Sequence, residues 1–107
     1  MDKDQTKFAL RVIRYQNSKM INICDIDLVG KIIKEGDLTI NLSESFFLEE
    51  VIDKQIAKEL LITCSMSNLV GKEIVDLAIQ LKLAKKVSIR FINGIPFLMI
   101  FKFQQSY

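Results

Sequence analysis

The stretch VSIRFINGIPFLMIFKF, residues 87–103, carries the clearest structural signal in this sequence of 107 residues. Asn93-Gly94 separates two apolar runs, and this dipeptide favours a two-residue type I′ turn because both of its residues accept a positive φ. The sequence therefore predicts a β-hairpin in which Ile92 faces Ile95. Pro96 has no backbone N–H to donate, so we expect the sheet to have an edge or an end beside it.

The second strand of this hairpin, Ile95 to Phe103, is apolar at almost every position. A strand with only one face on a core alternates apolar and polar residues, so both faces of this strand need cover. Either both are covered within the monomer, or one meets a partner, because large apolar patches usually mark interaction surfaces. The candidate interface consists of Ile95, Phe97, Met99 and Phe101, and its partner is a second copy of the chain or another protein.

Further strands are expected before this hairpin. Phe8 to Val12 and Met20 to Cys24 alternate around turn-forming residues and predict another hairpin, and Leu38 to Leu42 predicts one more strand. Ser43 to Ile52 is interpreted as a loop folded against the core. Met1 to Thr6 is polar and is expected to be loose.

Helical features appear in three places. Asp27 is expected to cap a short helix over Leu28 to Lys34 that ends at Gly36. Two longer helices are predicted over Asp53 to Met66 and Asn68 to Leu83, because each has an apolar stripe at helical spacing.

These segments predict a single α+β domain over residues 1–107, in the order β-β-(short α)-β-α-α-β-β. The expected sheet has about five mostly antiparallel strands, with the two longer helices on one face. Half of the residues are hydrophobic, which is enough for a core without metals or disulfides.

The composition excludes several kinds of protein. The net charge of +2 is too small to indicate nucleic acid or a membrane surface by itself. The charged N-terminus does not resemble a signal peptide, and no window approaches the ~20 apolar residues of a membrane span. We therefore expect a cytoplasmic protein with no membrane partner.

The sequence also limits the chemistry of the protein. It contains no histidine, which removes serine–histidine and cysteine–histidine catalysis within one chain. Cys24 and Cys64 are far apart in sequence and are interpreted as reduced core residues. We expect no metal, no cofactor and no enzymatic activity.

Two similar segments suggest an anion site. Gly30-Lys31 and Gly71-Lys72 each lie in the first turn of an expected helix, after a capping residue. Helix N-termini offer free N–H groups to phosphate, and lysine adds a positive charge. The alternative is that each glycine allows close packing and each cap serves only its own helix.

Basic residues on the expected strands suggest RNA binding. Arg11, Arg14 and Arg90 lie on or near strands, with Tyr15 close in sequence. Cations and an aromatic ring on an open sheet face can bind RNA by phosphate contacts and base stacking. The alternative is a sheet face that is simply solvated.

Several short motifs follow one another along the chain: Leu28-Val29-Gly30-Lys31, Glu35-Gly36, Ser45-Phe46-Phe47, Asn68-Leu69-Val70-Gly71 and Gly94-Ile95-Pro96. Their order and spacing resemble an archaeal protein family, the domain of unknown function 424. The resemblance spans about Phe8 to Phe103 and implies a small intracellular α+β protein without an established activity.

Three functions therefore stay open. The first is a non-enzymatic module that binds RNA or a ribonucleoprotein, with a role in translation. The second is a homodimeric or protein-interaction module that uses the apolar C-terminal strand. The third, which the lack of histidine disfavours, is a small enzyme.

Overall fold

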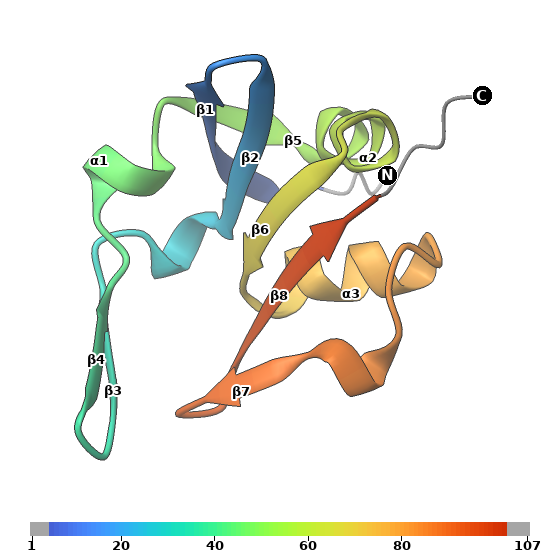
Figure 1. Ribbon diagram of the computed structural model, residues 1–107. Helices are drawn as coiled ribbons and strands as arrows, with labels where there is room; N and C mark the ends of the chain where they lie inside the picture. The colour runs from blue at the N-terminus through green and yellow to red at the C-terminus, as the bar shows by residue number, and fades with distance from the viewer. Residues whose placement is uncertain (1–4, 103–107) are drawn as a thin grey trace.

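The computed structural model describes residues 5–102 and confirms the α+β class (Figure 1). Met1 to Thr6 were expected to be loose, and the first four of these residues lie outside the described range. Phe103, at the end of the expected last strand, also lies outside it. The strands of the large sheet are β1 Lys7–Tyr15, β2 Ser18–Asp25, β5 Glu50–Asp53, β6 Met66–Val70, β7 Arg90–Ile92 and β8 Ile95–Phe101. A separate ribbon consists of β3 Ile32–Glu35 and β4 Leu38–Asn41. The helices are α1 Glu44–Phe47, α2 Lys54–Thr63 and α3 Lys72–Gln80. Two 3-10 turns, Ile26–Leu28 and Lys86–Ser88, connect β2 to β3 and α3 to β7.

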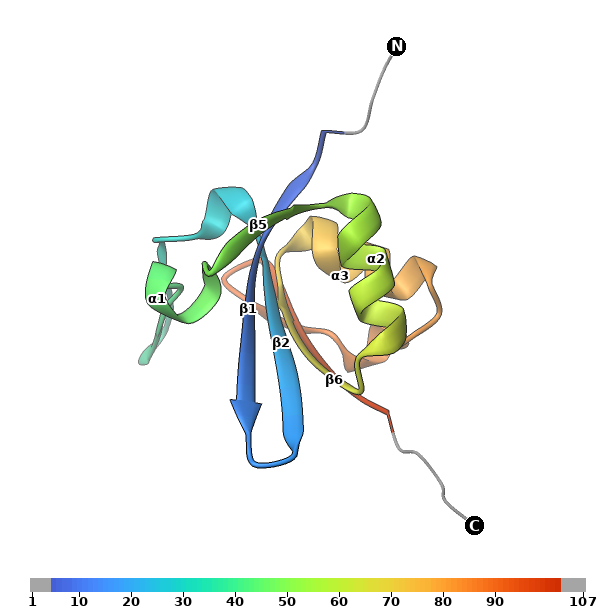
Figure 2. The same cartoon turned by 90° about the horizontal axis from the view of Figure 1, so that it is seen from above.

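The large sheet is mostly antiparallel, as predicted, and within residues 5–102 it has six strands in the order β5-β1-β2-β6-β8-β7. The pair β2 and β6 is parallel. Helices α2 and α3 cover one face of the sheet, whereas α1 and the ribbon lie on the other side (Figure 2). The sheet is therefore the middle layer of the molecule over part of its area.

The predicted C-terminal hairpin is confirmed. Asn93 and Gly94 both have positive φ values, 49° and 78°, and Ile92 pairs with Ile95. On its other side β8 pairs with β6 as far as Phe97, and the Pro96 carbonyl then accepts a hydrogen bond from the Gly71 N–H. The proline thus lies just past the end of the β6 ladder, where its missing N–H leaves no pair broken.

The predicted helix start at Asn68 is wrong, because Met66–Val70 is an interior strand. This segment pairs with β2 on one side and β8 on the other. Its apolar residues continue the stripe of α3, which explains why the pattern looked helical. The helix begins only after Gly71, whose φ of 118° and ψ of 154° are not helical.

The short helix expected over Leu28 to Lys34 is also wrong. The 3-10 turn ends at Leu28, and the Gly30 N–H then donates to the Leu42 carbonyl, which ties the chain into the ribbon. Gly36 lies in the turn between β3 and β4 and does not end a helix. The side chain of Ile33 is buried, so the ribbon packs against the sheet through this residue.

The loop expected over Ser43 to Ile52 is wrong in part. It contains α1 and the edge strand β5, in which Ile52 pairs with Phe8 of β1. The capping role predicted for Asp53 is confirmed, since its carboxylate accepts a hydrogen bond from the Ile56 N–H at 2.9 Å.

The core has two parts, one on each face of the sheet. The larger part lies under α2 and α3 and contains Leu69 and Leu98, which are 0% and 2% exposed. The smaller part lies under α1 and the ribbon and contains Ala9, Cys24 and Val70. Helix α3 packs on β2, β6 and β8, so it lies along the middle of the sheet.

Replacement of Leu69 tests which face of the sheet the helices cover. Leu69→Ala should lower the free energy of unfolding by about 3 kcal/mol, because it leaves a cavity under the helices. Met99→Ala, on β8 and on the opposite face, should cost less than about 1 kcal/mol, since Met99 is 53% exposed. Equal losses in urea unfolding would contradict the assigned faces.

Candidate functional site

The structure places the two predicted anion-binding segments in different surroundings. Gly30 and Lys31 precede strand β3, so the helix start on which this prediction depended does not exist at Gly30. Gly71 and Lys72 do precede a helix, α3. Their neighbourhoods nevertheless meet, because Leu28 and Lys72 line one surface depression of about 290 Å³.

The N-terminus of α3 already holds a carboxylate. The Asp25 oxygens, from the end of β2, accept hydrogen bonds from the N–H groups of Glu73 and Ile74, each at 2.9 Å. Burial raises the pKa of Asp25 above the usual range of an aspartate, and the two N–H donors oppose this shift. Asp27 and Glu73 line the same depression, so its charge disfavours a bound phosphate.

Gly71 makes room for this carboxylate. A Cβ atom at Gly71 would lie 2.4 Å from the Asp25 Cγ, and the φ of 118° is itself unfavourable for other residues. The glycine is therefore explained by close packing, which was the alternative to the anion site. Lys72 instead pairs with Asp76, at 2.9 Å on the surface of α3.

The predicted arginines do not form one stripe. Arg11 of β1 and Arg90 of β7 project from the same face of the sheet, but β2, β6 and β8 separate their strands. At about 4.8 Å per strand, the two positions are about 19 Å apart. Arg14 projects from the opposite face, because side chains alternate along a strand and Arg14 is three positions after Arg11. The structure does not describe the side chain of Tyr15.

The candidate interface on β8 is half covered. Ile95 and Phe97 pack against the smaller core, whereas Met99 and Phe101 are 53% and 55% exposed. The strand register places Phe101 in one row with further apolar residues of β1, β2 and β6. This open sheet face comprises Ile13, Met20, Met66, Met99 and Phe101.

Both cysteines are buried, as expected, with Cys24 0% and Cys64 6% exposed. Burial and the nearby Asp25 and Asp27 raise the pKa of Cys24 to about 12. This thiol is therefore protonated and inert at neutral pH.

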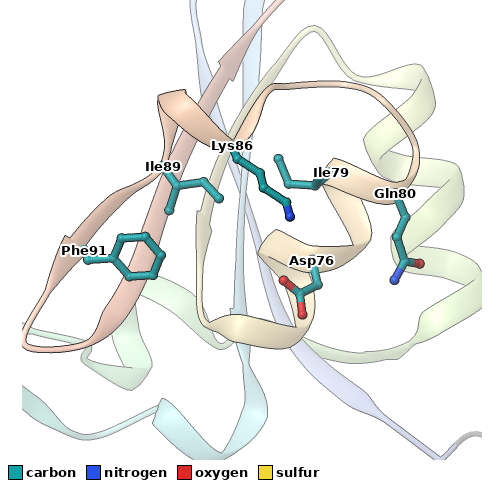
Figure 3. A pocket seen from close by; sticks show the side chains of 6 residues that line it. All are labelled: Asp76, Ile79, Gln80, Lys86, Ile89 and Phe91. Carbon is teal, nitrogen blue, oxygen red and sulfur yellow. The ribbon is translucent and has the colours of Figure 1, made fainter.

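A groove that the sequence analysis did not predict lies between α3 and β7 (Figure 3). It has a volume of about 520 Å³, which is in the range of ligand sites in proteins. We call it the α3–β7 groove. Its lining residues are Asp76, Ile79, Gln80, Lys86, Ile89 and Phe91.

The groove exists because β7 is the edge strand and α3 lies over the middle of the sheet. Ile79 and Gln80 follow Asp76 by three and four residues, so both share one side of α3 with it. Phe91 projects from β7 on the helix-covered face and is 60% exposed. An aromatic ring is thus left at the surface with polar groups of α3 across from it.

The part of the chain that follows Asp76 in sequence is strongly basic. Residues 77–107 contain no aspartate or glutamate and five cationic residues. These are Lys82, Lys85, Lys86, Arg90 and Lys102. The first four are exposed, whereas Lys102 donates hydrogen bonds to the α2 carbonyls of Leu61 and Ile62. This charge asymmetry was visible in the sequence, and only the position of Phe91 needed the fold.

Within residues 5–102 we find no group of three histidine, cysteine, aspartate or glutamate side chains that could hold a metal ion. In the same part of the chain, no helix is both long and apolar enough to cross a membrane.

A model of the family DUF424, described as a protein of unknown function, matches residues 13–103. The crystal structure of an uncharacterized conserved protein from Methanopyrus kandleri is similar, with a TM-score of 0.73 and 19% sequence identity. The similarity covers 94% of this chain and 97% of that one, and at this identity it shows the fold alone. No curated protein matches the sequence.

Replacement of Gly71 tests its contact with Asp25. Gly71→Ala should lower the free energy of unfolding by more than about 2 kcal/mol, because it adds a clash to an unfavourable φ. Gly30→Ala is the matched control, since Gly30 also has a positive φ but has open space around its Cβ position. Thermal or urea unfolding that shows equal losses for the two variants would contradict the packing role of Gly71.

Proposed function

This chain belongs to the DUF424 family of proteins of unknown function, and we propose that it is a non-enzymatic cytoplasmic module that binds single-stranded RNA in the α3–β7 groove. The RNA is free or part of a ribonucleoprotein, as in the translation machinery. The observation that carries the proposal is an exposed aromatic ring, Phe91, in a hollow bordered by the basic segment from Lys82 to Arg90.

The chemistry of unpaired RNA matches these two features. Its phosphates attract lysine and arginine, and its bases stack on exposed aromatic rings. Lys82, Lys85 and Lys86 follow α3 along the chain, and Lys86 lines the groove. Arg90 precedes Phe91 on the edge strand and projects from the opposite face. The groove is thus lined in part by the segment 82–91, which contains three lysines and no carboxylate in a chain with a net charge of only +2.

The groove supports RNA binding better than the arginines named from the sequence. Arg11 and Arg14 lie on opposite faces of the sheet, so they cannot follow one strand of RNA together. Arg90 precedes the groove residue Phe91 on β7, but it projects from the opposite face of the sheet. The depression near Asp25 favours an anion less, because three carboxylates line it.

Charge reversal beside the groove tests RNA binding. The double variant Lys85→Glu, Lys86→Glu should weaken binding of a fluorescent oligouridine more than about tenfold at low salt, in fluorescence anisotropy. Wild-type affinity should fall steadily as salt rises. The control Lys7→Glu, Lys34→Glu makes the same change of charge at exposed positions on other elements and should lose much less. Equal losses for both pairs, or no binding by the wild type, would refute the proposal.

A second candidate function uses the open sheet face. Met99 and Phe101 are more than half exposed beside Met20 and Met66, and flexible methionines suit contact surfaces. Here the chain acts as a protein-interaction module, with a second copy as the first partner to test.

Light scattering after size exclusion tests the homodimer directly. The wild type should have twice the mass of the chain at high concentration, and Phe101→Lys should have the mass of one chain because it buries a charge in the interface. Val87→Lys is the control, because Val87 is 88% exposed away from this face. A wild type that stays monomeric excludes the homodimer.

A further inference from the structure

One residue of the α3–β7 groove does not fit simple phosphate binding. Asp76 lines the groove, and its carboxylate repels the phosphates that the surrounding lysines attract. Its side chain is 51% exposed and pairs with Lys72, which is 77% exposed. Such surface pairs add little to stability, so this pair gives Asp76 only a minor structural role.

A carboxylate in a basic groove can instead bind the N–H groups of a nucleobase. Gln80 is four residues after Asp76, so the carboxylate and the amide are neighbours on the same side of α3. Figure 3 shows both side chains on the α3 wall, Phe91 and Ile89 on the β7 wall, and Lys86 between the walls. The groove therefore offers two acceptor oxygens and one amide on the α3 wall, across from an exposed ring.

Guanine is the base whose edge complements these groups. Its N1–H and its amino group are adjacent donors that one carboxylate can accept together, and its O6 accepts from an amide N–H. Adenine presents one donor beside the bare N1 lone pair, which a carboxylate repels. Uracil has one donor between two acceptors, and cytosine has one donor beside an acceptor.

We infer that the α3–β7 groove holds one unpaired guanine base, with Asp76 and Gln80 on its hydrogen-bonding edge and Phe91 against its ring. This inference rests on the proposed RNA-binding function and adds base selectivity to it. Lys85 and Lys86 then bind the adjoining phosphates without regard to sequence. The guanine comes from an RNA strand or from a free guanine nucleotide.

The test compares oligouridines of about ten nucleotides that carry one central guanine, adenine or cytosine. Fluorescence anisotropy should show the guanine oligonucleotide binding about tenfold more tightly than the other two. Asp76→Asn should abolish this preference while binding of plain oligouridine persists, because it removes an acceptor and a negative charge.

Glu73→Gln is the matched control, because it changes charge equally on the same helix at a residue that does not line the groove. It should keep the guanine preference. Phe91→Leu should weaken binding of all the oligonucleotides, since the ring stacks on any base.

The outcomes separate this inference from the function on which it rests. If the oligonucleotides bind with equal affinity, or if Asp76→Asn keeps the preference, guanine selectivity is refuted and RNA binding stands. If none of them binds the wild type, RNA binding itself fails. Competition with guanosine monophosphate identifies the source: displacement at a similar concentration supports a free nucleotide, and failure to displace supports an RNA strand.

Discussion

The position of α3 depends on the carboxylate of Asp25, which connects the end of β2 to the first turn of the helix. Two backbone N–H groups that no helical carbonyl can satisfy donate to this side chain. The contact requires a residue without a side chain at position 71, because Asp25 occupies that space. It also requires β2 and β6 to be parallel neighbours, so that the end of β2 lies beside the start of α3.

The α3–β7 groove follows from that arrangement. Once its first turn is held at β2, α3 lies over β2, β6 and β8 and leaves the edge strand β7 beside an open hollow. The charges of the chain are also unevenly divided along its sequence. The chain has 15 basic and 13 acidic residues. Residues 77–107 contain five basic residues and no acidic residue, so residues 1–76 contain ten basic and thirteen acidic residues. The chain before residue 77 therefore has a net charge of −3 and the rest +5, and the groove lies where the positive part meets Asp76.

Errors in the sequence analysis share one physical cause. The strands β5 and β6 are short, and their hydrogen bonds join residues that are far apart in sequence. Asn68 followed by an apolar run is compatible with a helix as well as with an interior strand. The helix start expected near Gly30 is absent for the same reason, because that segment is held by a hydrogen bond to Leu42 beside the ribbon.

The sequence by itself determined the features that depend on neighbouring residues. The Asn93-Gly94 turn, its register and the cap at Asp53 were all correct, because turns and caps are satisfied within a few residues. The exposure of Met99 and Phe101 depended on which strands lie side by side. The exposure of Phe91 also depended on the order of the strands. This order places β7 at the edge of the sheet, where α3 does not cover it.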